Sequence, residues 1–267
     1  MINGYKSKYP VQTLEKALDI LTYLKENPSA DGHSLNTISE GVGMGKSTVH
    51  RFLDTLLEYD FVEKSEDGTA YKLGWGIFEM ASNIPLCHGI DSEKVSVYLK
   101  NLSNHFGEII NLGIKNSNSM VIIKRFFPNP SAVTHRLITN VNIGEKEPLC
   151  CTGIGKLFLS EMDNEDILLI FRTEKDRPKT EYTITDESVL LNEIAGVRQK
   201  GFAVDNMEAS TEVFCIAVPL RDYTGKIIAG ISISVPAGRL KAEDIDNVAE
   251  KMKSASDKIS RYLGYIK

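Results

Sequence analysis

The sequence predicts an α+β protein of two domains, in which a small helical module with a β-hairpin precedes a larger domain built on a mainly antiparallel sheet. Three observations lead to this prediction. The chain has 267 residues, more than one small hydrophobic core usually organises. Residues 34–73 show helical spacing and then a tight hairpin turn. After residue 108, paired strand patterns alternate with helical segments.

Two helices joined by a glycine turn open this small module. Ser34 is a suitable N-cap for the first helix, and Gly43 and Gly45 mark the turn that follows it. We expect the second helix to begin close to Lys46, because apolar residues then recur at three- and four-residue steps. These apolar residues are Val49, Phe52, Leu53, Leu56 and Leu57. The rear of the second helix is therefore apolar, and its N-terminal outward side is polar.

A two-stranded wing is expected next. Residues 61–64 and 70–73 have strand character, and Asp67-Gly68 between them favours a tight turn. A helix with a polar N-terminal side and a following wing is the anatomy of a winged helix-turn-helix, which reads DNA in the major groove. The residues predicted to contact DNA are Lys46, Ser47, Thr48, His50, Arg51, Tyr71 and Lys72. The alternative is an ordinary helical hairpin with a solvated polar side, and the wing argues against it.

The charge of the chain matters for DNA binding, which depends on neutralising phosphates with lysine and arginine. The net charge is −5, and acidic residues outnumber basic ones even within residues 1–75. Within residues 35–53, however, Glu40 is the only acidic residue, while basic residues gather on the second helix, and Lys6 and Lys8 lie in an N-terminal arm. Such a focused basic face can bind DNA when a dimer doubles it. We expect salt-sensitive binding that depends on oligomerisation.

The cysteines and the hydropathy pattern limit other functions. Cys87, Cys150, Cys151 and Cys215 make neither a disulfide framework nor a Cys-x-x-Cys metal spacing, so we expect no structural metal and no other cofactor. No stretch approaches the roughly 18 apolar residues of a membrane span, and the N-terminal region has no continuous apolar signal-peptide core. The sequence predicts a cytoplasmic protein without a membrane partner.

A linker separates the two predicted domains. Residues 75–84 continue helically from the wing, and a polar stretch around Gly89 precedes a helix at residues 95–106. The predicted parts are residues 1–74 as DNA-binding domain, residues 75–92 as linker helix and residues 93–267 as second domain.

The second domain is predicted to contain hairpin-paired strands with helices between them. The strands are expected at residues 108–114, 120–126, 134–141, 214–221 and 227–235. The helices are expected at residues 153–160, 163–172, 186–200 and 242–263. Strands that pair first as hairpins indicate a mainly antiparallel sheet.

Two local patterns in this domain indicate a ligand pocket. Gly153-Ile154 opens a helix whose free backbone N–H groups suit a carboxylate or hydroxyl of a small ligand. Ser232 and Ser234 point to one face of their strand by period-two alternation, while the neighbouring isoleucines face the other layer. Two hydroxyls between apolar neighbours suit a polar small molecule.

The segments VQTLEKALDIL (11–21), KSTVHR (46–51) and YKLG (71–74) stand in the order and at the spacing of motifs in the IclR family of bacterial transcription regulators, which this chain resembles. Further segments with this resemblance are residues 149–156, 182–186, 197–205, 215–220 and 231–234. The resemblance covers nearly the whole chain. It implies a GAF-like effector-binding domain behind the winged helix, joined by a linker helix, and assembly as a homodimer or a dimer of dimers.

The resemblance also implies where an effector binds. The matching positions are Gly153, Ile154, Asp205, Cys215, Ser232 and Ser234. Ile154 departs from the family, whose members often carry alanine there, and the bulkier side chain narrows the space. Glyoxylate, aromatic acids, sugar acids and acyl-homoserine lactone-like compounds stay open by analogy, and we favour a small organic or sugar acid.

Taken one by one, these pocket residues have simpler explanations. Cys215 can be a small buried hydrophobe, Ser232 and Ser234 can be solvent-facing strand residues, and Asp205 can be a turn residue. Only their convergence makes a site.

The sequence therefore predicts a transcriptional regulator, expected to be a repressor, that binds a palindromic double-stranded DNA operator under the control of a small organic or sugar acid. Two alternatives stay open: a GAF-type small-molecule sensor acting through protein contacts, and a cysteine-dependent enzyme. The enzyme needs a base beside Cys215, and the sequence places none of the five histidines there. We expect no catalytic residues.

Overall fold

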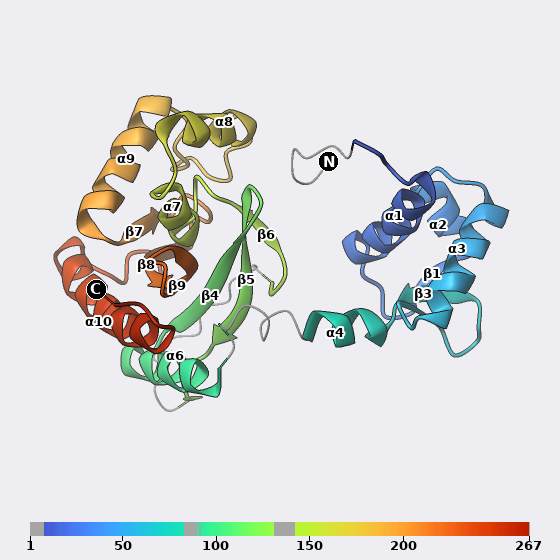
Figure 1. The fold of residues 1–267 in the computed structure, drawn as a ribbon, viewed down its shortest axis with the longest axis horizontal. Coiled ribbons are helices and arrows are strands. Elements are labelled where there is room, and N and C mark those ends of the chain that lie inside the picture. Colours follow the sequence, from blue (N-terminus) through green and yellow to red (C-terminus); the bar gives the residue numbers. More distant parts are fainter. Residues whose placement is uncertain (1–7, 83–89, 91, 131–141, 267) are drawn as a thin grey trace. The chain divides into compact units, whose positions relative to one another are not determined.

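The computed structural model describes residues 8–82, 90, 92–130 and 142–266. The chain divides into two compact units, Met1–Gly89 and Ile90–Lys267, whose elements are labelled in Figure 1. Several sequence features lie outside the described residues: Lys6, Cys87, His88, His135 and the strand expected at residues 134–141. The exact limits of the linker stay a prediction.

The N-terminal unit contains the predicted helix-turn-helix. Its first three helices are α1 (Gln12–Glu26), α2 (Leu35–Gly41) and α3 (Lys46–Glu58). Ser34 caps α2, because its side-chain oxygen accepts a hydrogen bond of 3.2 Å from the backbone N–H of Thr37. Gly43 has a φ of 64° in the turn before α3, a conformation that glycine adopts without steric cost. Side chains from all three helices, including Ile20, Ile38 and Leu53, form one core.

The predicted wing is part of a three-stranded antiparallel sheet. Its strands β1 (His33–Ser34), β3 (Ala70–Leu73) and β2 (Val62–Lys64) are neighbours in that order. Asp67 holds the turn between β2 and β3, since its side chain accepts a hydrogen bond of 3.1 Å from the backbone N–H of Thr69. The two-residue strand β1 was not predicted, because so short a segment has no periodicity. Helix α4 (Trp75–Ser82) follows the wing as expected.

The larger unit is built on a six-stranded sheet in which every pair of neighbours is antiparallel, as predicted. The order along the sheet is β6 (Lys146–Pro148), β5 (Ser119–Phe126), β4 (Ile109–Asn116), β9 (Ile227–Pro236), β8 (Val213–Arg221) and β7 (Ala203–Asn206). The edge strands β6 and β7 were not predicted. They are short, and pairing with a neighbour defines them more than their own sequence does.

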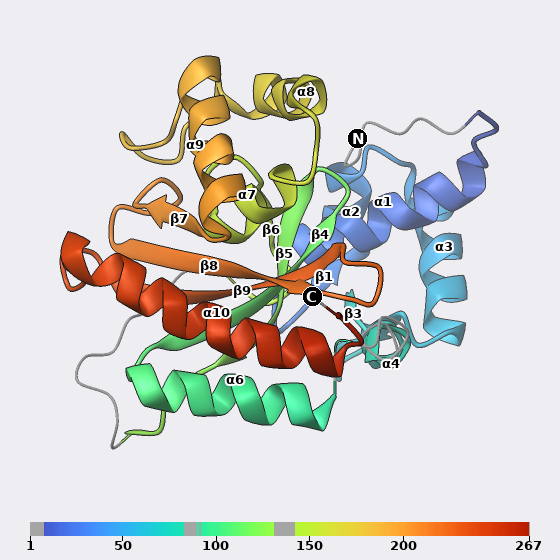
Figure 2. The ribbon, with the colours of Figure 1, turned by 60° about the vertical axis from the view of Figure 1, so that its left-hand side comes forward.

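Helices cover both faces of this sheet. Figure 2 shows α6 (Glu93–Phe106) and α10 (Ile245–Tyr262) along one face, and α7 (Gly153–Leu159), α8 (Asn164–Glu174) and α9 (Glu187–Lys200) on the other side. Ile231 and Ile233 pack in the core beneath α6 and α10, whereas Ile154 and Leu157 pack in the core on the α7 side. The helix expected from residue 242 begins as a short 3-10 turn, Ala242–Asp244. No helix in the described part of the chain is both long and apolar enough to cross a bilayer.

Helix α7 lies very close to the segment that precedes it. A Cβ atom built on Gly155 would lie 2.3 Å from the carbonyl oxygen and 2.5 Å from the Cα atom of Leu149. Both contacts are with backbone, which cannot rotate away. Gly196 in α9 is the opposite case, because a Cβ there meets nothing within 4 Å.

Two glycine-to-alanine substitutions in helices should therefore have opposite effects. We expect Gly155→Ala to destabilise the larger unit by about 1–3 kcal/mol, since the added methyl overpacks α7. We expect Gly196→Ala to stabilise it by up to about 1 kcal/mol, since alanine is the better helix former. Thermal unfolding of the full-length variants measures both. A Gly155→Ala protein that unfolds at the wild-type temperature would show that α7 can move off Leu149.

Candidate effector pocket and candidate nucleic-acid interface

The N-terminal half of α3 presents the predicted DNA-contacting side chains outward. Lys46, Ser47, His50 and Arg51 are exposed and Thr48 is half-buried. The core-facing residues of α3 lie on its other side. Glycine occupies the N-cap and brings no side-chain oxygen to the first N–H groups of this helix, which carry a partial positive charge. Exposed cationic side chains and free helix N–H groups therefore occur together in the N-terminal half of α3, which suits phosphate binding.

The two predicted DNA-contacting residues of the wing differ in exposure. Lys72 is half-buried, and its Nζ lies 3.3 Å from Glu63 Oε1, so part of its charge is neutralised on the wing itself. Tyr71 is a correction: it is 6% exposed and packs in the core of the N-terminal unit. Side chains alternate along a strand, so β3 turns Tyr71 inward where Lys72 faces outward. We assign Tyr71 to the core and not to the DNA-contacting surface.

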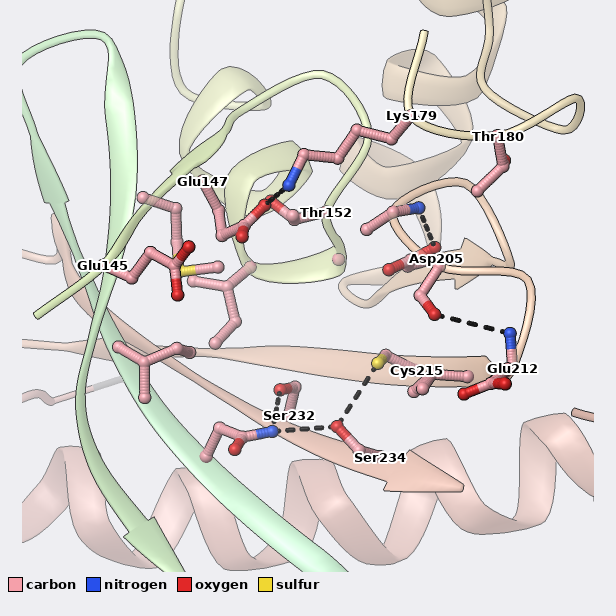
Figure 3. A pocket seen from close by; sticks show the side chains of 18 of the residues that line it. Glu145, Glu147, Thr152, Lys179, Thr180, Asp205, Glu212, Cys215, Ser232 and Ser234 are labelled. Atoms are coloured by element: carbon pink, nitrogen blue, oxygen red, sulfur yellow. Dashed lines mark hydrogen bonds and ion pairs between the residues drawn. The ribbon is translucent and has the colours of Figure 1, made fainter. Parts of the chain in front are cut away.

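A cavity of about 410 Å³ opens between the sheet and α7 in the larger unit (Figure 3). Its wall includes all six predicted effector-binding residues: Gly153, Ile154, Asp205, Cys215, Ser232 and Ser234. They come from α7, β7, β8 and β9, which lie far apart in sequence. The volume falls in the range of about 300–1,000 Å³ that is typical of small-molecule sites.

The register of the strands places the polar residues of the sheet side by side. Asn111 on β4 pairs with Ser232 on β9, Ser234 pairs with Cys215 on β8, and Cys215 pairs with Asp205 on β7. Asn111 Nδ2 donates to Ser234 Oγ at 2.9 Å and to Ser232 Oγ at 3.3 Å, and Cys215 Sγ lies 3.4 Å from Ser234 Oγ. Ser232 and Ser234 are 5% and 4% exposed, so they are buried in the cavity wall and do not face bulk solvent.

The N-terminus of α7 forms the facing wall. Thr152 caps the helix, accepting a hydrogen bond of 3.2 Å from the backbone N–H of Gly155 and donating one of 2.8 Å to the carbonyl of Pro148. The first two N–H groups of α7, on Gly153 and Ile154, are of the kind that an α-helix leaves without an intrahelical acceptor. A Cβ on Gly153 would come within 3.1 Å of the Ala217 side chain, so glycine permits this close approach.

The bulkier residue at 154 is accommodated by the sheet. Gly113 and Gly230 pair directly across β4 and β9. A Cβ on Gly230 would lie 2.8 Å from Ile154 Cγ2, and one on Gly113 would lie 3.1 Å from Ile154 Cδ1. The two glycines leave a notch in the sheet surface that receives part of this side chain. Ile154 therefore narrows the cavity less than its size alone suggested.

Asp205 lies near the end of strand β7, and its side chain also holds the turn that follows, in which Met207 has a φ of 62°. Asp205 Oδ1 accepts hydrogen bonds from the backbone N–H groups of Glu208 at 2.8 Å and Ala209 at 3.2 Å. Burial raises the pKa of Asp205 to about 7, and the neighbouring Glu208 carboxylate adds to this. Near neutral pH the carboxyl group can therefore donate or accept a hydrogen bond.

A buried ammonium group supports the loop that follows Asp205. Lys156 on α7 is fully buried, and its Nζ donates to Glu208 Oε1 at 2.5 Å and to the carbonyl of Val204 at 2.9 Å. Lysine is rarely buried unless paired, so this contact fixes α7 to the end of β7.

Several further polar residues line the cavity and were not predicted from the sequence: Asn111, Arg125, Glu145, Glu147, Lys179, Thr180 and Glu212. Figure 3 shows Lys179 and Glu147, which form an ion pair, across the cavity from Ser232 and Ser234. Lys179 lies in a loop with no local signature. Asn111 and Arg125 left a weak signal, since each is a polar residue within an apolar strand pattern.

The cysteines of the larger unit are poor nucleophiles. Burial raises the pKa values of Cys150, Cys151 and Cys215 above the ordinary value, which keeps them as neutral thiols. Among the cavity-lining residues that the structure describes there is no histidine to act as a base.

The stability of the protein should depend on the protonation of Asp205. The folded carboxyl keeps its proton up to a pH of about 7, whereas an unfolded one loses it near pH 4. Between these values the folded state binds more protons than the unfolded state, so its stability falls as pH rises. Asp205→Asn keeps the acceptor oxygen and removes the titration. Thermal unfolding should show a stability advantage of the variant that grows from about pH 4 to about pH 7 and then levels off; a constant difference would contradict this.

Comparisons with known proteins agree with this geometry. The family model "Bacterial transcriptional regulator IclR C-terminal" matches residues 89–261, and the model "IclR helix-turn-helix domain" matches residues 13–66. The HTH-type transcriptional regulator KdgR of Escherichia coli K12 is 32% identical over 271 residues, which span 99% of this chain and 98% of that protein.

Two further relatives support the same assignment. The DNA-binding transcriptional repressor YiaJ of Escherichia coli K12 is 28% identical over 260 residues, covering 95% of this chain and 88% of that protein. The crystal structure of Thermotoga maritima IclR superposes with a TM-score of 0.73 at 28% identity, covering 95% of this chain and 99% of that chain. Because the two family models together match most of both units, this chain belongs to the IclR family of bacterial transcriptional regulators.

Proposed function

We propose that this regulator is a repressor that binds a palindromic DNA operator, and that a small organic or sugar acid in the cavity changes its operator binding. The observation that carries the proposal is the convergence of the six predicted effector-binding residues on one cavity wall. A repressor is favoured because relatives such as YiaJ carry that name. The protein acts in the cytoplasm in this proposal.

The DNA contact is assigned to the outward side of α3. Lys46 and Arg51 supply positive charge near its N-terminus, and Ser47, Thr48 and His50 supply hydrogen-bonding groups beside them. In winged helix-turn-helix proteins such a helix enters the major groove. Lys72 on the wing is a further candidate for a phosphate contact.

The ligand class follows from the cavity wall. Most lining residues are polar, and none of those that the structure describes is aromatic, which favours a hydrophilic ligand over an aromatic acid. The two serine hydroxyls and the first N–H groups of α7 suit a carboxylate. The protonated form of Asp205 adds a donor. No catalytic role is assigned to the cavity, because burial keeps the Cys215 thiol neutral and no histidine stands among the described lining residues.

An exposed apolar face on α1 supports assembly as a dimer. Val11, at the N-cap position of α1, is 61% exposed, and Leu14 and Leu18 are 58% and 51% exposed. Their spacing of three and four residues puts them on one side of the helix. We infer that this face packs against a second copy, which would present two recognition helices to two operator half-sites. A dimer of two such dimers is compatible with the same contact.

Coupling between the cavity and the operator requires that the acid bind one dimer geometry better than another. The coupling free energy between two allosteric sites is typically about 1–3 kcal/mol. The segment 73–104, which includes the linker, joins the two units in sequence and is the proposed carrier of the change.

Arg51→Ala should weaken operator binding by at least about tenfold, because each protomer loses a cationic contact. The slope of log affinity against log salt should fall by about two, one for each protomer of the dimer. Fluorescence anisotropy with the upstream intergenic DNA measures both quantities. The matched control is Arg172→Ala, which removes an equal charge from the surface of the larger unit.

The same assay with a panel of small organic and sugar acids tests the effector part of the proposal. An acid that changes operator affinity supports it.

For the substitution in α3, wild-type affinity of the Arg51→Ala protein for the operator would show that α3 is not the reading helix.

The double substitution Leu14→Glu/Leu18→Glu should split the dimer, because it places charge on the apolar face of α1. Light scattering after size-exclusion chromatography should give half the wild-type mass, with a corresponding loss of operator binding. Leu169→Glu is the control, since Leu169 is 65% exposed on α8 and lies in the other unit. An unchanged mass for the α1 variant would place the dimer contact elsewhere.

A further inference from the structure

A row of polar residues crosses the sheet beneath the cavity. Arg125 on β5 pairs with Asn111 on β4, and Asn111 pairs with Ser232 on β9. The row continues through Ser234 and Cys215 to Asp205 at the other edge. Arg125 is the residue of this row that carries a permanent positive charge.

Arg125 determines how the Asn111 side chain is oriented. Its Nε donates a hydrogen bond of 3.0 Å to Asn111 Oδ1. A guanidinium group has only donors, so the oxygen of the amide and not its NH₂ group must face it. The NH₂ group is then directed at Ser232 and Ser234, where the distances of 3.3 and 2.9 Å are found.

The orientation of Asn111 in turn determines what the serines offer to a ligand. Each serine oxygen accepts a hydrogen bond from the amide, so the hydroxyl hydrogen must point away from Asn111. The directions that remain are the cavity and, for Ser234, the Cys215 sulfur at 3.4 Å. The Ser232 hydroxyl therefore presents a donor to the cavity, and the Ser234 hydroxyl does so whenever it does not donate to Cys215. Donors of this kind suit the oxygens of a carboxylate.

We propose that Arg125, acting through Asn111, is the residue that makes this pocket select a carboxylate over a neutral group of the same shape. This inference rests on the proposed function, because it takes the cavity as the effector site. Arg125 is a positioning residue for the serines, and it also contributes positive charge to the cavity wall.

The rest of the cavity indicates what the carboxylate is attached to. Asp205 lies at the far end of the row, and Glu145 and Glu212 also line the wall, so acceptors are available for ligand hydroxyls. The cavity has a volume of about 410 Å³, within the range of about 300–1,000 Å³ that is typical of small-molecule sites. A hydroxylated acid of several carbons fills this space better than a two-carbon acid does.

The test compares D-gluconate with D-gluconamide, which have the same hydroxylated chain and differ in the charge of one end. Titration calorimetry on the full-length dimer should show at least about a tenfold preference of the wild type for gluconate, since charge-assisted hydrogen bonds are stronger. Arg125→Lys should keep a preference, because lysine is also a donor only. Arg125→Gln should reduce the preference for gluconate. Arg125→Glu should abolish or reverse this preference, because the Asn111 amide can then rotate and turn its NH₂ group toward residue 125.

Lys124→Gln is the matched control, because Lys124 is the neighbouring cation on β5 and its Nζ contacts Ser96 on α6, away from the cavity. The Lys124→Gln variant should show the same preference for gluconate over gluconamide as the wild type. The inference is overturned if the wild type shows no preference for the acid, if Arg125→Glu keeps the preference, or if Lys124→Gln loses it equally. Operator binding is measured separately, so a preference for the acid without any effect on operator affinity would count against the proposed regulation and not against the role of Arg125.

Discussion

The close packing of α7 on the sheet is the constraint on which the pocket depends. Gly155 lets the helix approach the backbone of Leu149, and Gly153 lets its N-terminus approach β8. Only at this distance do the first N–H groups of α7 face the serines of β9 across a space of ligand size. Larger side chains at either glycine would separate the two walls, and the residues that line them would no longer act on one ligand.

Charge buried beneath the pocket holds the same elements together. Taking Lys156 out of water is costly, and its contacts with Glu208 and the Val204 carbonyl offset that cost. Burial raises the pKa of Glu208, although the nearby ammonium group acts in the opposite direction. The end of β7 and the loop after it therefore carry two acidic groups, Asp205 and Glu208, whose protonation is linked through their proximity. Glu208 anchors this segment to Lys156 on α7, and Asp205 beside it lines the cavity.

The sequence predicted those features whose signals are local. Ser34 and Asp67-Gly68 specify a helix start and a turn by their own chemistry, and period-two alternation placed Ser232 and Ser234 on one face. Asn111 and Arg125 could not be assigned to the site, because their importance depends on which strands are neighbours in the sheet. Tyr71 was wrongly placed for a related reason. A tyrosine suits both a core and an interface, and only the packing of β3 decides between them.

The notch formed by Gly113 and Gly230 has a consequence for how pockets of this kind diversify. Ile154 and the two glycines occupy one volume, so no member of this trio can be exchanged independently of the others. Enlarging either glycine would push the isoleucine into the ligand space, whereas shortening the isoleucine would deepen the pocket into the sheet. Ligand preference is thus encoded partly in strand positions with no side chain of their own, which a comparison restricted to cavity-lining side chains overlooks.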